Sequence, residues 1–203
     1  MLYLQNNKIT RMSGFDKLKK LRKLYLTRNK VQVLEGLLEN KMLEELHVDR
    51  QLLRPGEHFV MDPRSCQALA SCLRTLNISG SNCHDLAGLE LMAGLQALSA
   101  ANNQLALLEP VLEVVSSLSM LTSLDLTSNL TLNKDPQYRT QLIARARALT
   151  LLDGRAVEQT NRVLAQQISY KRLQSASRAS RQSTSASYGQ ESGDETNYSI
   201  DND

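Results

Sequence analysis

The stretch Leu21-Arg-Lys-Leu-Tyr-Leu-Thr-Arg-Asn-Lys-Val31 contains the pattern that decides the fold. Its leucines, at positions 21, 24 and 26, are followed by an asparagine at 29 and an apolar residue at 31. The pattern L-x-x-L-x-L-x-x-N-x-L recurs, and the equivalents of Leu24 are Leu2, Leu46, Leu76, Leu98 and Leu124. The steps between these leucines are 22, 22, 30, 22 and 26 residues long. Six copies in register indicate that the chain is built from one repeated structural unit.

A unit of this length and pattern is typical of a leucine-rich-repeat solenoid. In each copy the middle leucines lie on a short strand, whose alternation directs them into the core and the intervening residues onto a concave face. A 22-residue step leaves room for one short helix on the convex side. The sequence therefore predicts an α/β fold: a curved, right-handed leucine-rich-repeat solenoid with a parallel concave sheet, short convex helices, a C-terminal helical cap and a disordered tail.

Three regions are expected along the chain. Residues 1–135 contain about six repeats, of which the first is truncated, and residues 136–173 form a C-terminal cap and helix. Residues 174–203 are rich in serine and are expected to be disordered, because so polar a segment buries too little apolar area to offset its ordering entropy. Since the first copy starts at residue 2, we expect the chain to be a shortened version of a longer array.

The asparagine of each copy is expected to pair with backbone groups at a buried corner. Two copies depart from the pattern, because Gln51 and Ser81 stand in the asparagine position. The 30-residue step between these copies contains turn-forming residues at 54–57 and 62–64. Helical spacing follows over 65–73, and Asp62 is predicted as the N-cap of this helix, with Pro63 at its first position.

The repeat pattern ends near Pro136. We expect a helix over about 136–147, a last strand near Leu151 and a turn at 153–154, followed by a second helix that reaches about Leu173. The apolar stripe expected to cover the last core layer consists of Val157, Leu164 and Ile168.

Composition argues against several functional classes. No 18-residue apolar run and no secretory signal are recognisable. The three cysteines (Cys66, Cys72 and Cys83) follow no disulfide framework, so reduced thiols in the cytosol or nucleus are expected. The three histidines fall in different repeats, and no nucleophile–base arrangement or phosphate-binding loop is present. We therefore expect no enzyme activity, no cofactor and no metal site.

Basic residues are concentrated near the N-terminus. Residues 8–30 contain nine Lys/Arg and one acid, Asp16. Lys17, Lys19 and Lys20 are expected on the convex side and Lys23 on the concave face, so the charges do not form one stripe. This distribution argues against nucleic acid as the main partner. An acidic tubulin tail, an RNA-associated repeat protein that uses the basic segment, and a merely solubilising surface stay open as alternatives.

Strand alternation identifies the residues of the concave face. The residue between the two strand leucines is, in order, Tyr3, Tyr25, His47, Asn77, Ser99 and Asp125. The first three repeats offer aromatic and charged groups and the later three small polar ones, and interface energy is concentrated in such aromatic and arginine anchors. An alternative is that these are only solvated strand positions. The predicted partner-binding residues are Tyr3, Lys23, Tyr25, Arg28, His47, Asp49 and Arg50.

Several motifs resemble a known family. The x-x-L-x-G-L phrases at 12–18 and 34–37, and the block from Tyr138-Arg139 to Leu152-Asp153-Gly154, are similar to the 22-residue leucine-rich-repeat subclass that includes regulatory subunits of protein phosphatase 1. The resemblance covers roughly residues 2–165 and is most specific at 54–64. It implies a non-catalytic protein that binds the phosphatase 1 catalytic subunit, with tubulin or motor proteins as further partners, at centrosomal microtubule-organising centres; the nucleus is not excluded.

Overall fold

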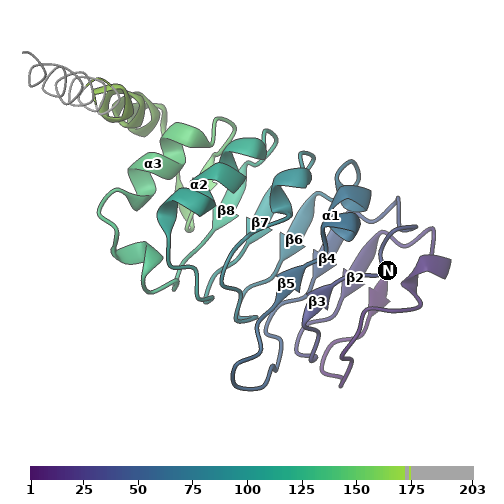
Figure 1. Cartoon of the computed structure of the whole chain (residues 1–203). Helices are drawn as coiled ribbons and strands as arrows, with labels where there is room; N and C mark the ends of the chain where they lie inside the picture. The colour runs from purple at the N-terminus through teal and green to yellow at the C-terminus, as the bar shows by residue number, and fades with distance from the viewer. Residues whose placement is uncertain (172–173, 175–203) are drawn as a thin grey trace, which may run out of the picture. The chain divides into compact units, whose positions relative to one another are not determined.

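The computed structural model describes residues 1–171 and Gln174, and residues 1–165 form one compact unit. Its main feature is an eight-stranded sheet in which successive repeats supply neighbouring strands (Figure 1). All neighbours are parallel except the last pair, β9 and β10. In spatial order the strands are β1 (Leu2–Tyr3), β2 (Lys23–Tyr25), β4 (Glu45–His47), β6 (Thr75–Asn77), β7 (Ala97–Ser99), β8 (Ser123–Asp125), β9 (Leu151–Leu152) and β10 (Arg155–Ala156).

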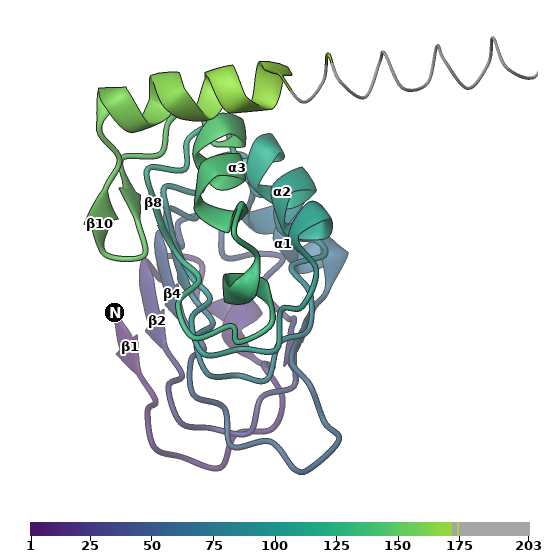
Figure 2. The same ribbon diagram turned by 90° about the vertical axis from the view of Figure 1, so that its left-hand side faces the viewer.

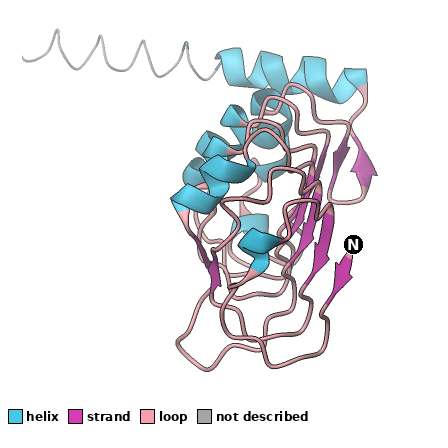
Figure 3. Ribbon diagram, turned by 90° about the vertical axis from the view of Figure 1, so that its right-hand side faces the viewer, coloured by secondary structure: helices cyan, strands magenta, loops and turns pink. Residues whose placement is uncertain are grey.

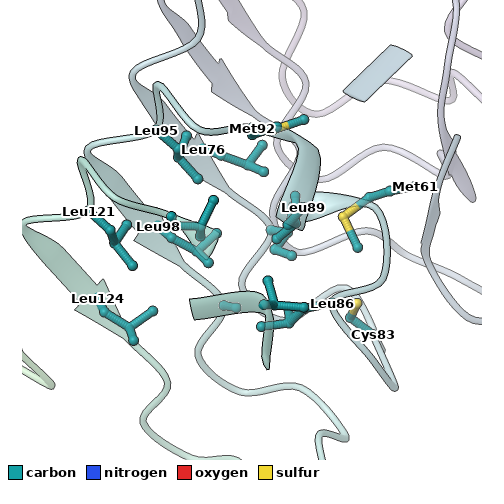
Figure 4. Close-up of a cluster of buried hydrophobic side chains, with 14 of the residues drawn as sticks. Met61, Leu76, Cys83, Leu86, Leu89, Met92, Leu95, Leu98, Leu121 and Leu124 are labelled. Atoms are coloured by element: carbon teal, nitrogen blue, oxygen red, sulfur yellow. The ribbon is translucent and has the colours of Figure 1, made fainter. Parts of the chain in front are cut away.

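The repeat leucines lie in register across this sheet, as the sequence predicts. Leu2 pairs with Leu24, Leu24 with Leu46, and the series continues through Leu76 and Leu98. These side chains are buried from the second copy onward, and they form one layer of the core. Figure 4 shows part of this layer, with Leu76, Leu98 and Leu124 from the sheet opposite Leu86 and Leu89.

The other layer of the core comes from the segments that connect these strands, which lie across from the sheet (Figures 2 and 3). Two short strands, β3 and β5, pair with each other in a second, parallel sheet. The connecting elements are the 3₁₀ turn η1 (Phe15–Lys17), β3 (Val33–Leu34), β5 (Val60–Met61), helix α1 (Pro63–Leu69), the 3₁₀ turn η2 (Leu89–Leu91), helix α2 (Leu108–Ser117), the 3₁₀ turn η3 (Leu132–Lys134) and helix α3 (Tyr138–Arg145).

The expected short helix after every strand is found only in the longer repeats. The three 22-residue steps contain η1, β3 and η2, whereas α1, α2 and α3 lie in the steps that exceed 22 residues. The connection in a 22-residue step must turn twice, which leaves room for one 3₁₀ turn or a two-residue strand. The predicted cap of α1 is confirmed, since the Asp62 carboxylate accepts the backbone N–H groups of Arg64 and Ser65 and Pro63 is the first helical residue.

The corner residues form a ladder of buried hydrogen bonds. The Asn29 amide donates to the carbonyls of Leu4 (2.8 Å) and Leu26 (2.9 Å), and its oxygen accepts the N–H of Ile9 at 3.0 Å. Such bonds connect adjacent repeats because each corner side chain reaches the backbone of the preceding repeat. Asn103 and Asn129 occupy the same position and are also buried.

Gln51 fills the asparagine position without losing either hydrogen-bonding role. Its amide donates to the carbonyls of Leu26 (2.9 Å) and Asp49 (3.1 Å), and its oxygen accepts the N–H of Val31 at 2.9 Å. Ser81 is shorter, and its hydroxyl donates to the carbonyl of Val48 at 2.9 Å. The corner ladder therefore continues through both departures from the repeat pattern.

The C-terminal cap closes the last repeat through Asp153. One oxygen of this carboxylate accepts the Tyr138 hydroxyl and the other accepts the N–H of Leu126, both at 2.9 Å. The Arg139 guanidinium donates to the carbonyls of Leu152 (3.0 Å) and Ala156 (3.2 Å). The predicted helix, last strand and turn all lie where the sequence places them.

The helix that follows the cap, over residues 159–171, differs from expectation in the face that it buries. Leu164, assigned to the buried stripe, is 56% exposed, whereas Ala165 is 2% exposed. Arg162 donates to the carbonyls of Ala146 (3.2 Å) and Leu149 (2.6 Å), which end the preceding segment. Arg162 therefore ties the first turn of this helix to the segment between α3 and β9, a contact that the apolar periodicity did not reveal. The predicted tail lies outside the described residues, except for Gln174, and the division of the chain into three regions stays a prediction.

Candidate partner-binding face

The concave face of the first three repeats presents a ladder of stacked rings. Tyr3, Tyr25 and His47 occupy equivalent positions on β1, β2 and β4, so the strand register places them side by side. The ring centroids of Tyr3 and Tyr25 are 4.8 Å apart and those of Tyr25 and His47 are 4.7 Å apart, each with an interplanar angle of 18°. Offset-stacked rings at this spacing attract one another. The three side chains thus form one continuous surface, which we call the aromatic ladder.

A single carboxylate holds two of the three rings of this ladder in place. Glu45 accepts hydrogen bonds from the Tyr25 hydroxyl at 2.7 Å and from the Lys23 ammonium at 2.6 Å, and its oxygen lies 2.9 Å from Nε2 of His47. Three neighbouring side chains therefore converge on one acid. The rotamers of Tyr25 and His47 are defined before any partner arrives, which reduces the entropy lost on binding.

These contacts change the pKa values of Glu45, Lys23 and Tyr25. The hydrogen bond from Lys23, with those from Tyr25 and His47, outweighs partial burial and lowers the pKa of the Glu45 carboxyl to about 2. The hydrogen bond to Glu45 raises the pKa values of both Lys23 and Tyr25. Glu45 is therefore ionised at neutral pH, and it offsets the charge of Lys23.

Glu45 is expected to make stability depend on pH in the acidic range. Its folded-state pKa of about 2 lies below the ordinary value of 4.5, so its contribution is present above about pH 4.5 and is lost as the pH falls toward 2. Urea unfolding of the wild type and of Glu45→Gln between pH 2 and 6 should show a stability difference that shrinks toward acid pH. A difference that does not change with pH would contradict this account of the cluster.

The remaining predicted residues lie where β2 and β4 run into the corners. Asp49 is only 6% exposed; it accepts the Thr27 hydroxyl at 2.7 Å and lies 3.7 Å from Nε of Arg50. Arg28 and Arg50 are exposed, and both have a left-handed backbone, with φ of 57° and 54°. Asp49 can therefore act on a partner only through Thr27 and Arg50, whereas the two arginines are accessible.

The structure joins the seven predicted residues into two adjacent groups. In the first group Lys23, Tyr25 and His47 contact Glu45 and Tyr3 stacks on Tyr25; Arg28, Asp49 and Arg50 form the second group. The sequence placed Glu45 on the concave face but did not select it as a binding residue. The register of Lys23 opposite Glu45 was the available signal, because opposite charges on paired strand positions attract each other.

The later repeats present a different concave surface. Asn77, Ser99 and Asp125 follow His47 in register. Asn77 and Asp125 accept backbone N–H groups two residues further along, from Ser79 and Thr127, at 3.0 Å each. Their polar groups are thus used within their own strands, and the aromatic and cationic groups that favour binding are confined to the first three repeats.

Other kinds of site receive no support in the residues described. No group of three or more His, Cys, Asp and Glu side chains there could hold a metal ion. Burial raises the pKa of the Cys66 and Cys83 thiols to about 12, which makes both unreactive at neutral pH. No helix within the searched residues is both long enough and apolar enough for a membrane span.

Comparisons with known proteins agree with this architecture. The family described as Leucine Rich repeats (2 copies) matches residues 1–39. An internalin, InlF, from Listeria monocytogenes has a similar structure, with a TM-score of 0.56 and 23% identity, and the match covers 75% of this chain and 40% of the internalin. The Drosophila melanogaster SNF/U2A' complex contains a chain with a TM-score of 0.53 and 23% identity, over 81% of this chain and 78% of that one.

The fold is thus that of a leucine-rich-repeat protein, with a parallel sheet of many strands and short connecting helices. Domains of this class are generally non-catalytic modules that serve as scaffolds for interactions with other proteins. The chain spans only about 40% of the length of the internalin, and both likenesses, at 23% identity, concern the fold alone.

Proposed function

We propose that this protein is a non-catalytic adaptor that binds a folded protein through the aromatic ladder on its concave face. The observation that carries the proposal is the stacking of Tyr3, Tyr25 and His47, of which the last two are held by the Glu45 carboxylate. Tyr3 is 59% exposed, although a large ring gains free energy when it leaves water. Tyrosine and arginine anchors dominate the energy of many interfaces, and a rigid surface binds with little reordering.

The partner that we propose is the catalytic subunit of protein phosphatase 1. This assignment rests on resemblance: the stretches 2–11, 43–48 and 54–64 together resemble protein phosphatase 1 regulatory subunit 42, a testis leucine-rich-repeat protein. The phosphatase-docking peptide pattern, a basic residue, Val or Ile, any residue and an aromatic one, has its nearest match at Lys30–Val33, which lacks the aromatic residue. Val31 is also fully buried there. The concave face is therefore the surface that we assign to the phosphatase.

From the same resemblance we propose that the adaptor places the phosphatase at microtubule-organising structures such as the centrosome, in the cytoplasm. A second candidate function is binding to tubulin or a motor protein without the phosphatase. The observation that favours it is a groove of about 570 Å³ beside β1, lined by Lys17, Lys19, Lys20, Leu18 and Leu21 among others. An acidic tubulin tail complements those lysines, and the interaction would weaken as salt screens the charges.

The test of the proposed function is retention of purified phosphatase 1 catalytic subunit on the immobilised full chain. The variant Tyr25→Ala/His47→Ala removes two rings of the aromatic ladder. Its affinity for the phosphatase is expected to be about a hundredfold lower than that of the wild type, since each large interface anchor typically contributes more than 1 kcal/mol. Binding of the wild type should persist when the salt concentration is raised, because the ladder contact is mainly apolar.

The matched control is Ser99→Ala/Ser123→Ala, which truncates two side chains on the same face in the later repeats. This control should bind as the wild type does. If the Tyr25/His47 variant retains the phosphatase unchanged, the aromatic ladder is not the binding surface. Microtubule co-sedimentation that fades with salt, is lost in Lys17→Ala/Lys20→Ala and is unaffected by Tyr25→Ala/His47→Ala would favour the second candidate.

A further inference from the structure

We propose that Arg28 and Arg50 form a carboxylate-binding rim on the concave face, which receives an acidic segment of the bound protein. The inference rests on the proposed function, because it assigns a chemistry to one border of the same face. We call this pair the arginine rim. Both residues directly precede a buried corner residue, Asn29 and Gln51 respectively.

The backbone at these two positions disfavours arginine. The residue before the corner is left-handed in successive repeats, with φ between 52° and 63° at Asn6, Arg28, Arg50, Gly80, Asn102 and Ser128. Glycine and asparagine tolerate this conformation, whereas a residue with a long side chain is strained in it. Since Gly80 and Asn102 make the same turn, the fold does not require arginine there. Strain that the fold does not require points to a role in binding.

The two arginines are also neighbours with the same charge. The backbone N–H of Arg28 bonds to the carbonyl of Asp49 at 3.1 Å, and that of Arg50 bonds to the carbonyl of Ser79 at 2.7 Å, so the strand ladder extends through both. Adjacent parallel strands lie about 4.8 Å apart. Like charges at adjacent positions repel each other, which is a second cost that an asparagine pair would avoid.

The local charges leave the arginine rim positive. Asp49 lies 3.7 Å from Arg50 but is buried, and it also accepts the Thr27 hydroxyl. Among the residues described, no ion pair involves Arg28. The Lys23 charge is already offset by Glu45 at 2.6 Å. Of the two guanidinium groups, only that of Arg50 has a carboxylate nearby, and that carboxylate is buried.

The position of the side chains suits an incoming acid. The Arg50 side chain is 71% exposed. Its stem passes over Gly80, where a Cβ atom would lie 3.6 Å from Cγ of Arg50. A guanidinium recognises a carboxylate through two parallel N–H···O bonds. When the partner protein covers the aromatic ladder, an acidic side chain of that partner beside it would therefore neutralise the arginine rim.

The experiment uses the full chain and a fluorescein-labelled hexaglutamate peptide, with binding followed by fluorescence anisotropy at low salt. The variant Arg28→Asn/Arg50→Asn should lower the affinity about tenfold or more, because it removes two charge-assisted contacts. The matched control, Lys8→Asn/Lys30→Asn, removes the same charge from exposed positions just past the corner asparagines and should change the affinity less than about twofold. The arginine variant should also keep or raise the melting temperature, by about 2–4 °C where strain and repulsion are relieved.

Three results would overturn the arginine rim: no binding of the peptide by the wild type, an equal loss in the lysine control, or a lower melting temperature in the arginine variant. The last result would mean that the arginines serve the fold. The Tyr25→Ala/His47→Ala variant keeps both arginines and should still bind hexaglutamate. The phosphatase assay therefore tests the proposed function, and the peptide assay tests the arginine rim. A negative result in the first assay leaves the result of the second unaffected.

Discussion

Replacing Asn103 with alanine is expected to lower the free energy of unfolding by about 4 kcal/mol or more, because three buried backbone groups lose their partner at about 1–3 kcal/mol each. These groups are the carbonyl of Ile78 and the N–H groups of Ser81 and Cys83, whereas the carbonyl of Ala100 keeps a hydrogen bond from the Asn129 amide. The amide of Asn103 donates to the carbonyls of Ile78 (3.1 Å) and Ala100 (3.0 Å). Its oxygen accepts the N–H groups of Ser81 (3.1 Å) and Cys83 (2.9 Å). No other side chain of the corner ladder accepts two backbone N–H groups from the preceding repeat in the part of the chain that the structure describes.

The control for this prediction is Asn7→Ala, which changes the same residue type at the same repeat position. Asn7 is exposed, and its amide donates only to the carbonyls of Leu4 and Gln5, both at 3.1 Å. Water can replace those bonds, so the expected loss is about 0.5 kcal/mol. Urea unfolding followed by circular dichroism, with the slope m unchanged, measures both values. Similar losses in the two variants would show that burial does not determine the contribution of the corner asparagine.

Replacing Gly36 with alanine is expected to destabilise the protein by about 3 kcal/mol or more. Gly36 has φ of 71°, and a Cβ atom on it would overlap the backbone carbonyl oxygen of Met12, which belongs to the preceding repeat and cannot rotate away. Met12 is itself buried, so the repeats would have to separate locally. Both the strained dihedral and the overlap oppose the substitution.

Gly14 provides the matched control. It stands at the equivalent position of the preceding repeat and has φ of 80°, but nothing lies within 4 Å of an added Cβ. Gly14→Ala should therefore cost only the strain of the left-handed conformation, about 1 kcal/mol. Thermal and urea unfolding of the two variants compare these values directly. Equal losses would mean that the dihedral angle alone, and not the approach of Met12, limits position 36.

The sequence predicted which residues share the concave face, but not how they interact. Tyr3, Tyr25 and His47 follow from period and alternation, and the structure adds that their rings stack. The role of Glu45 was missed because it depends on side-chain rotamers on neighbouring strands. Asp49 was selected as a binding residue from its position, yet it is buried, because Thr27 and Arg50 cover it.

The sequence by itself determined the repeat, the strand register, the core leucines and the Asp62 cap. These features depend on spacing along the chain, which a period of about 22 residues expresses directly. The tertiary structure alone decided that Gln51 could replace an asparagine, that 22-residue steps would hold no α-helix and that Gly36 would meet Met12 while Gly14 meets nothing. It also decided that two arginines lie side by side with a strained backbone. Each of these depends on distances between different repeats, and a pattern that is the same in every repeat contains no information about such differences.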